Sequence, residues 1–462
     1  MSRKSLLTAI IALTGSTALQ VSIAAALPVV PGATGYGMDT PAGRGGTVYR
    51  VTNLNESGTG SLKACVLASG PRVCVFEVSG TIRLTSEIEV WNPYLTVAGQ
   101  TAPSPGIMVR GAPLVILASD VLVQHIRFRA GDDPNGPPGE NRDSLSVSGP
   151  SAGGKVRNVV FDHNSIEWAV DELSNVWGFF DNITLNNNIF AEALNDSIHP
   201  QGPHGYGPIL GGDDAGNVSM AGNLFAHTEY RNPASRARNF VFVNNVIYNR
   251  ANGDISLSSD FQNNPTTNSI VGNVFLKGPD YKWAIQPIFI DDQSSSTSWP
   301  TGSTIYAADN VSDEPYSGSS IIGRYTGTSF TSSLRTAPVA WLTGLVAKPT
   351  ANNAVYDAVL ANAGARPADR DAVDLRIIQS VKSRTGQIIN CVSADGSSRC
   401  AKNGGGWPVI AQKTRALTLP ANPNAVAANG YTNLENWLHA YSDEVEGKGV
   451  IDPLPPSNLV VE

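Results

Sequence analysis

Short alternating apolar segments framed by asparagines recur through the middle of the chain. In four copies, two asparagines lie six residues apart, apolar and polar residues alternate between them, and an apolar pair follows the second asparagine. Alternation with a period of two predicts a β-strand in each copy. The four copies occupy residues 158–164, 182–188, 217–223 and 239–245.

Successive copies start 24, 35 and 22 residues apart and show no helical period. A unit of this size cannot bury a core alone, so the copies must stack on one another. We therefore predict an all-β chain folded as a parallel β-helix. The repeated asparagines are expected to stack at the bends, where their amides hydrogen-bond along the stack and tolerate left-handed backbone. Ordinary sandwich strands are the alternative, and the fixed asparagine spacing disfavours them.

The repeat extends weakly in both directions, with a copy at 269–275 and earlier ones at 94–99 and 121–128. A short helix near 61–67 is expected to cap the first coil, and the Ser- and Thr-rich stretch 294–333 is expected to form loops. Further helices are predicted at 355–363, 373–383 and 434–440. These patterns divide the mature chain into a β-helix domain over 27–345 and a C-terminal extension over 346–462, which packs on the β-helix or caps it.

The N-terminus is typical of a secretory signal peptide over residues 1–26. Arg3 and Lys4 precede an apolar stretch over 6–13, and three alanines at 24–26 offer a cleavage site. A membrane anchor is the alternative, but polar residues interrupt this short stretch, and no later segment is apolar enough to span a bilayer. The sequence thus predicts a secreted protein, extracellular or periplasmic, that does not associate with membranes.

The 462-residue chain has 45 glycines, 30 prolines and only 15% charged residues, which is typical of a turn-rich β protein. Removal of the signal peptide would change the formal net charge from −7 to −9. An acidic chain is unsuited to general nucleic-acid binding, so a polyanionic partner must meet a local basic site or a metal ion. The protein is expected to act as a monomer.

Four cysteines form two close pairs, each nine residues apart: Cys65 with Cys74, and Cys391 with Cys400. In a secreted protein this spacing predicts two local disulfides. A zinc site is the alternative, but the spacing does not match the usual ligand pairs.

Three acidic residues are candidate metal ligands. Glu167 and Asp171 follow the strand of the 158–164 copy, and Asp143 fits the preceding coil on the same side. Residues four apart on extended chain face the same way, so we expect these carboxylates to converge. Oxygen-only ligands with flexible geometry favour Ca²⁺. Solvated surface acids are the alternative interpretation.

Arg231 and Arg236 form an Arg-x-Pro-x-x-Arg segment after the 217–223 copy. Paired arginines suit a bidentate grip on sugar carboxylates, and structural salt bridges are the alternative. The 35-residue unit that starts at residue 182 contains an insertion over 192–212, which is expected to form a loop on the binding face. Within it, His204 and Tyr206 are candidates for sugar contacts, with loop packing as the alternative.

Several segments resemble the extracellular pectate lyases of polysaccharide lyase family 1. The most telling are VVFDHNSIEWAVDE (159–172), IRFRAGDD (126–133), GNLFAHTEYRNPASR (222–236) and NFVFVNNVIYN (239–249). Similar segments near both ends extend the likeness over nearly the whole mature chain. The resemblance implies a right-handed parallel β-helix that binds Ca²⁺ and cleaves polygalacturonate, an acidic polysaccharide, by β-elimination.

Carried over residue by residue, the resemblance implies that Asp143, Glu167 and Asp171 are calcium ligands. Arg231 resembles the catalytic base, and Arg236 resembles the second arginine of the substrate-binding pair. The family commonly has a substrate-binding lysine in the stretch before this coil, whereas this chain has His204 and Tyr206 there. A β-helix glycoside hydrolase, a lyase acting on another uronan and a non-catalytic polysaccharide-binding protein remain as alternatives.

Overall fold

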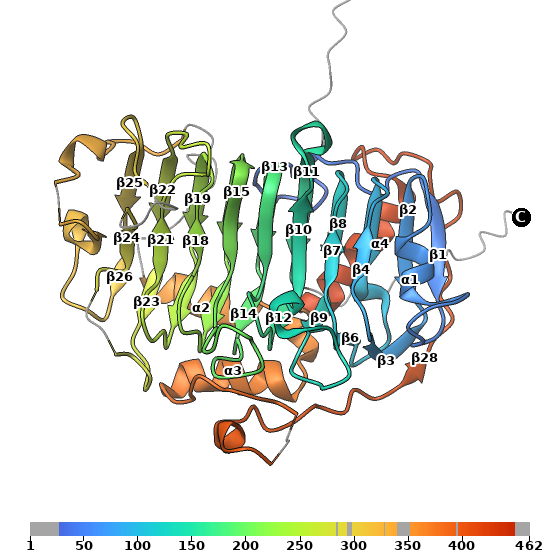
Figure 1. Ribbon diagram of the computed structural model, residues 1–462. Helices are drawn as coiled ribbons and strands as arrows, with labels where there is room; N and C mark the ends of the chain where they lie inside the picture. Colours follow the sequence, from blue (N-terminus) through green and yellow to red (C-terminus); the bar gives the residue numbers. More distant parts are fainter. Residues whose placement is uncertain are drawn as a thin grey trace, which may run out of the picture.

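The computed structural model describes residues 27–282, 285–292, 298–327, 329–339, 352–393 and 396–448. The predicted signal peptide over 1–26 lies outside the described residues. Within them, three stacks of parallel strands wind into an elongated β-helix (Figure 1). This confirms the predicted fold class. From β2 onward, each coil contributes one strand to stack 1, then one to stack 2, then one to stack 3.

The strands pair in parallel with those of the coils before and after. Stack 1 contains β1 (Thr47–Val51), β2 (Arg72–Phe76), β5 (Leu95–Ala98), β8 (Val121–Gln124), β11 (Val156–Asp162), the second half of β13 (Asn175–Asn186), β16 (Asn217–Ala221), β19 (Asn239–Val243), β22 (Thr267–Val271) and β25 (Thr304–Ala308).

Stack 2 contains β3 (Val78–Arg83), β6 (Ile107–Arg110), β9 (Ile126–Arg129), β12 (Ser165–Glu167), β14 (Ile189–Ala191), β17 (Leu224–Ala226), β20 (Val246–Tyr248), β23 (Val274–Leu276) and β26 (Val311–Ser312). Stack 3 contains β4 (Ile88–Val90), β7 (Leu114–Ile116), β10 (Leu145–Gly149), the first half of β13, β15 (Ile209–Ala215), β18 (Ala234–Ser235), β21 (Ile255–Leu257), β24 (Ile288–Ile290) and β27 (Ile322–Arg324).

Stacked asparagines at the bend between stacks 1 and 2 hold the coils together, as the repeat predicts. From Asn188 onward, each side-chain oxygen accepts hydrogen bonds from the backbone and side-chain nitrogens of the asparagine one coil earlier, at 2.8–3.2 Å. The left-handed residue of this bend is the one before the ladder asparagine, for example His163 and Asn187 (φ 52° and 54°). The ladder consists of Asn164, Asn188, Asn223, Asn245, Asn273 and Asn310.

A second asparagine ladder runs along the start of the stack 1 strands. Asn239 donates to Asn217 (2.7 Å), Asn217 donates to Asn182 (2.8 Å), and Asn182 donates to Asn158 (3.3 Å). Both asparagines of the six-residue spacing therefore form ladders. Because each amide offers both a donor and an acceptor, one residue type can continue such a ladder through every coil.

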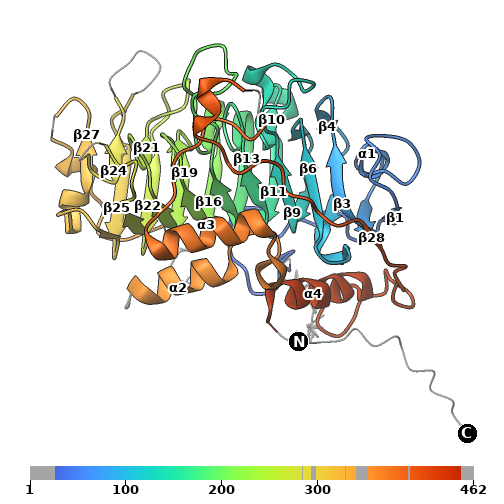
Figure 2. The ribbon, with the colours of Figure 1, turned by 90° about the horizontal axis from the view of Figure 1, so that it is seen from below.

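The ends and flanks of the β-helix are covered by helices. Helix α1 (Leu62–Val66) lies at the N-terminal end, and its buried residues join the main core, as expected of a cap. Helices α2 (Asn352–Asn362) and α3 (Ala372–Ser383) pack their apolar residues against the outer face of stack 2, and α4 (Asn433–Glu446) packs against the N-terminal part of stack 1 (Figure 2). Strand β28 (Lys413–Thr414) pairs antiparallel with β3.

The three predicted C-terminal helices are therefore present, but one loop prediction is wrong. The stretch 294–333 contains β25, β26 and β27, which continue all three stacks. In β25, Tyr306 is followed by two alanines where other strands of stack 1 have large apolar residues. The apolar–polar alternation in this part of the sequence is therefore weak. The predicted disulfides join Cys65 to Cys74 and Cys391 to Cys400. Among the described residues, no helix has the length and apolarity needed to cross a membrane.

Candidate active site at a corner of the β-helix

Polar residues gather where successive coils turn from stack 2 into stack 3. We call these turns, which lead into β10, β13, β15 and β18, the charged corner. Because parallel strands of one stack start at the same height, residues preceding them in consecutive coils lie side by side. Isolated bridges join Glu172 to Tyr206 and Tyr206 to Tyr230, which continues the alignment through the turns. The turns before β10, β13, β15 and β18 carry Asp143, Asp171, Tyr206 and Arg231, respectively.

Three carboxylates cluster in this corner. Oxygen atoms of Asp143, Asp171 and Glu172 lie within 4.8 Å of one another. Asp143 accepts hydrogen bonds from the Ser146 hydroxyl (3.0 Å) and the backbone nitrogen of Glu172 (3.1 Å). Burial and, secondly, the charge of Asp171 raise the pKa of Asp143 to about 8. The acids thus repel one another, and a cation between them would remove that repulsion.

Asn175, the first residue of β13, adds a further oxygen beside these acids. Its side chain hydrogen-bonds Asp143, and its amide oxygen is buried without a hydrogen-bond partner among the described residues. An orphaned buried carbonyl costs free energy unless a donor or a cation satisfies it. Carboxylate and amide oxygens are the ligand set of a hard divalent cation such as Ca²⁺, so the residues present fit this ion.

Glu167 does not join the acid cluster, and this part of the sequence prediction is wrong. Its side chain is fully buried, and its Oε2 atom lies 2.5 Å from Nε of Arg129. Arg129 also contacts Asp371 and Asp374 at the start of α3, so Glu167 belongs to a network that fastens α3 to the β-helix. The cause is Trp168: its left-handed backbone (φ 61°) ends β12, so the period-two alternation stops before Asp171.

Arg231 lies directly beside the acids. Its guanidinium forms an ion pair with Glu172 and lies 4.4 Å above the ring of Tyr206. Burial and the neighbouring charge of Arg236 lower the pKa of Arg231 to about 10, although Asp171 and Asp143 oppose this shift. An arginine with a depressed pKa in contact with an acid cluster is a candidate functional group.

Arg236 lies just beyond β18, beside two aromatic rings. Its guanidinium carbon is 5.0 Å from the ring centre of Phe261 and 5.8 Å from that of Trp177. Phe261 is 50% exposed. Burial lowers the pKa of Arg236, while Asp291 opposes the shift. The structure therefore places a cation next to an exposed aromatic surface, which suits a sugar that carries a carboxylate.

The insertion brings two histidines over the acids. Nε2 of His204 lies 2.9 Å from Oδ1 of Asp171, and the ring of His204 stacks on His199 (3.9 Å) and against Tyr206 (4.0 Å). His204 and Tyr206 thus lie in the corner with Asp171. The sequence reasoning missed His199 and Glu172. The available signals were a second histidine in the same insertion and a second acid adjacent to Asp171.

A cavity of about 640 Å³ opens next to the corner. Its walls include Tyr206, Tyr230, Asp291 and Tyr325, so both aromatic rings and a carboxylate line it. A cavity of this size accommodates a small number of sugar units. Fold and site together place the chain in the class of parallel β-helix proteins with a charged site at a strand corner.

Comparison with known proteins narrows this class. A probable pectate lyase C from Neosartorya fischeri is 32% identical over 453 residues, which cover 92% of this chain and 98% of that protein. The chain therefore belongs to the pectate lyase family, the family 1 polysaccharide lyases that its sequence resembles. Members of this family are lyases that act on polysaccharides. A probable pectate lyase C from Aspergillus flavus is 38% identical over 258 residues, 55% of this chain and 56% of that protein.

Two solved structures are also similar. Pectate lyase II from Xanthomonas campestris has a TM-score of 0.48 and 16% identity over 74% of this chain and 100% of that one. Pectate lyase C from Erwinia chrysanthemi, with Ca²⁺, has a TM-score of 0.45 and 15% identity over 74% of this chain and 99% of that one. No protein-family model matches the chain.

Proposed function

We propose that the protein is a secreted, monomeric, calcium-dependent pectate lyase. It cleaves polygalacturonate by β-elimination and releases 4,5-unsaturated oligogalacturonides. The observation that carries the proposal is the position of Arg231, which has a depressed pKa and lies between an acid cluster and a second arginine. The two disulfides support an oxidising compartment outside the cytoplasm.

Asp143 and Asp171 are proposed calcium ligands, with Glu172 in place of Glu167. When bound, Ca²⁺ would neutralise the uronate carboxylate and thereby acidify the neighbouring C5–H bond. Glu172 contacts both the acid cluster and Arg231. A ligand role for Glu172 therefore weakens its ion pair with Arg231, and this favours the neutral guanidine that a base requires.

Neutral Arg231 would take the C5 proton of the uronate. The electrons of the C5–H bond form the C4–C5 double bond, the C4–O4 bond breaks, and solvent supplies a proton to the departing oxygen. Arg236 would hold a substrate carboxylate, and Trp177 and Phe261 offer rings for stacking against the sugar. His204 and Tyr206 would contact the sugar from the insertion. Tyr206 would thus place a neutral ring where the family commonly has a substrate-binding lysine.

The test is a panel of uronans, namely polygalacturonate, methyl-esterified pectin, glucuronan and alginate, each with Ca²⁺ or with a chelator. The expected result is a calcium-dependent ultraviolet absorbance from unsaturated ends on polygalacturonate. Reducing ends without this absorbance would identify a hydrolase, and binding without loss of viscosity would identify a non-catalytic protein. Absorbance on another uronan alone would reassign the substrate.

A variant pair tests the assigned base. Arg231→Lys should lower product formation by at least about 1,000-fold. The flexible lysine side chain cannot reproduce the planar geometry by which the guanidine group of Arg231 would reach the C5 proton. Calcium binding, measured by calorimetry, should persist. Arg238→Lys is the matched control, because Arg238 pairs with Asp214 away from the acid cluster. Near-normal elimination by Arg231→Lys would remove Arg231 from this role.

A further inference from the structure

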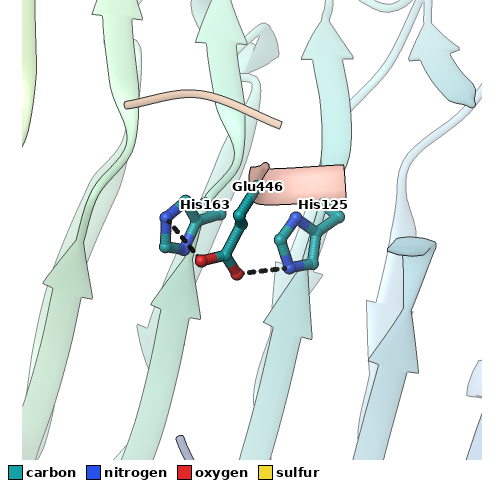
Figure 3. Close-up of side chains that lie close together, drawn as sticks. All are labelled: His125, His163 and Glu446. Atoms are coloured by element: carbon teal, nitrogen blue, oxygen red, sulfur yellow. Dashed lines mark ion pairs between the residues drawn. The ribbon is translucent and has the colours of Figure 1, made fainter. Parts of the chain in front are cut away.

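Three ionisable side chains meet in the interior between the β-helix and α4. His125 lies in the turn between β8 and β9, and His163 in the turn between β11 and β12. Glu446 is the last residue of α4. Figure 3 shows both rings directed at the Glu446 carboxylate. The side chains are only 0%, 3% and 3% exposed, so bulk water does not solvate them.

The local fold positions both histidines. Each occupies the left-handed residue of its bend (φ 57° and 52°), and the two coils are adjacent. The backbone nitrogen of His125 donates to the carbonyl of His163 (3.0 Å), and the rings stack with centroids 5.3 Å apart. At the other end, α4 terminates immediately after Glu446 at Gly447, which has a left-handed backbone. The three residues are thus held by regular backbone.

The outer ring nitrogens fix which tautomer each imidazole adopts in its neutral form. Nδ1 of His125 is 2.7 Å from the carbonyl oxygen of Ala365, and Nδ1 of His163 is 2.9 Å from Oδ2 of Asp162. A carbonyl and a carboxylate accept hydrogen bonds, so each Nδ1 must carry a proton. In a neutral imidazole, each Nε2 then presents a lone pair. Asp162 is itself held by the Gln124 amide (2.9 Å), which fixes this outer contact.

These lone pairs face an acceptor. Nε2 of His125 is 3.4 Å from Oε1 of Glu446, and Nε2 of His163 is 3.5 Å from Oε2. Among the described residues, neither Nε2 has a hydrogen-bond partner. Both distances exceed an ordinary hydrogen bond of about 2.7–3.2 Å. The His125 distance matches the edge of a tetrahedron whose ligands lie about 2.0–2.1 Å from a central zinc ion, which is about 3.3–3.4 Å, and one ligand atom from each of the three residues lies within 4.8 Å of the other two.

We propose that His125, His163 and Glu446 bind one divalent cation of the zinc class and that this ion fastens α4 to the β-helix. Two imidazole nitrogens favour zinc over calcium, which prefers oxygen. Metal-binding histidines usually donate their second ring N–H to a carbonyl or a carboxylate. Here Nδ1 of His125 faces the Ala365 carbonyl, and Nδ1 of His163 faces the Asp162 carboxylate. The charges of Asp162 and Glu446 balance a divalent ion. Water takes the fourth position.

Lys448 is the competitor for Glu446. Its ammonium forms an ion pair with Oε2, while the lysine side chain is 54% exposed. An exposed lysine can swing into solvent at little cost, so the cation displaces it. Removal of Lys448 should therefore tighten metal binding, whereas loss of a ligand should abolish it.

The test uses the tag-free full-length chain saturated with Ca²⁺ and dialysed against low zinc. Elemental analysis should give about one zinc per chain, and Co²⁺ in place of zinc should give the visible absorption bands of a tetrahedral site. His163→Ala and Glu446→Gln should lose at least about tenfold in zinc affinity. His439→Ala is the matched control, because His439 lies on the same helix and outside the cluster.

A second control separates this cluster from the charged corner, where Asp171, His199 and His204 also lie close enough to share an ion. Asp171→Asn should leave zinc binding by the buried cluster unchanged. Zinc should also raise the melting temperature of the wild type and of Lys448→Ala, but not of Glu446→Gln. Absence of zinc binding, or zinc content that falls in Asp171→Asn and persists in His163→Ala and Glu446→Gln, would overturn the proposal.

Discussion

Asn223→Ala is expected to be among the most destabilising single changes in the β-helix core. Asn223 is fully buried and lies in the middle of the inner ladder. Its oxygen accepts from the backbone and side-chain nitrogens of Asn188 (2.8 and 3.2 Å), and its amide nitrogen donates to Leu185 (2.9 Å) and Asn245 (2.8 Å). Alanine removes all four hydrogen bonds, and water has no access to replace them.

The magnitude follows from what each partner retains. In the variant, the side-chain nitrogen of Asn188 still donates to the carbonyl oxygen of Phe161. The side-chain oxygen of Asn245 still accepts from the backbone nitrogen of residue 223. The backbone N–H of Asn188 loses the hydrogen bond that Asn223 supplied. An orphaned buried group costs about 1–3 kcal/mol, and each further lost hydrogen bond costs about 0.5–1.5 kcal/mol. With central values for one orphaned group and three further lost hydrogen bonds, the expected loss of unfolding free energy is about 5 kcal/mol.

Asn310→Ala is the matched control at the end of the same ladder. Asn310 accepts the same pair of bonds from Asn273 (3.0 and 2.9 Å) and donates to Ile270 (2.8 Å), but it is only half-buried. Water can replace these bonds, so the expected loss is about 1 kcal/mol. Urea unfolding, followed by circular dichroism, measures both. Equal losses in the two variants would refute the idea that burial of the ladder sets its contribution.

Two further predictions concern the charged corner. The neutral form of Arg231 is the proposed base, and its pKa is depressed to about 10 before bound Ca²⁺ lowers it further. The elimination rate at saturating Ca²⁺ should therefore rise about tenfold per pH unit and level off below pH 10. A rate that peaks near neutral pH in initial-velocity assays would contradict this assignment. Glu172→Gln should weaken calcium binding at least about tenfold by calorimetry. Glu167→Gln should leave calcium affinity unchanged and lower the melting temperature, since it removes one of the buried partners of Arg129. The reverse pattern would restore Glu167 as the ligand.

The β-helix was predictable because its signal is repeated. Each asparagine ladder needs the same residue at the same height in every coil, so the constraint appears in the sequence as a fixed spacing between residues such as Asn217 and Asn223. The coil within 294–333 was not predicted because polar and small residues fill positions that earlier coils give to Val and Phe. Its strands follow from pairing with neighbours such as β22, which a local pattern does not encode.

The charged corner was only partly predictable. Each of three site residues precedes a strand of stack 3, namely Asp143, Asp171 and Arg231. Because the coils stack in register, their spacing along the repeat was enough to predict that they lie close together. Glu167 was wrongly predicted as a ligand because the chain is not extended through Trp168, where the backbone turns left-handed. Such a turn at a tryptophan has no local sequence signal, because Gly and Asn are the residues that usually mark it. Glu172 therefore occupies the position that spacing had assigned to Glu167.

The contacts of Glu172 link calcium binding to the basicity of Arg231. Glu172 lies within 4.8 Å of the Asp143 and Asp171 oxygens and pairs with Arg231, so its charge stabilises either a cation or the protonated guanidinium. Thermodynamic linkage then requires that higher calcium occupancy lower the pKa of Arg231 and that protonation of Arg231 weaken calcium binding. The alkaline rise in rate should accordingly begin at lower pH as calcium concentration increases. A pH profile that does not move with calcium would show that Glu172 serves only one of the two partners.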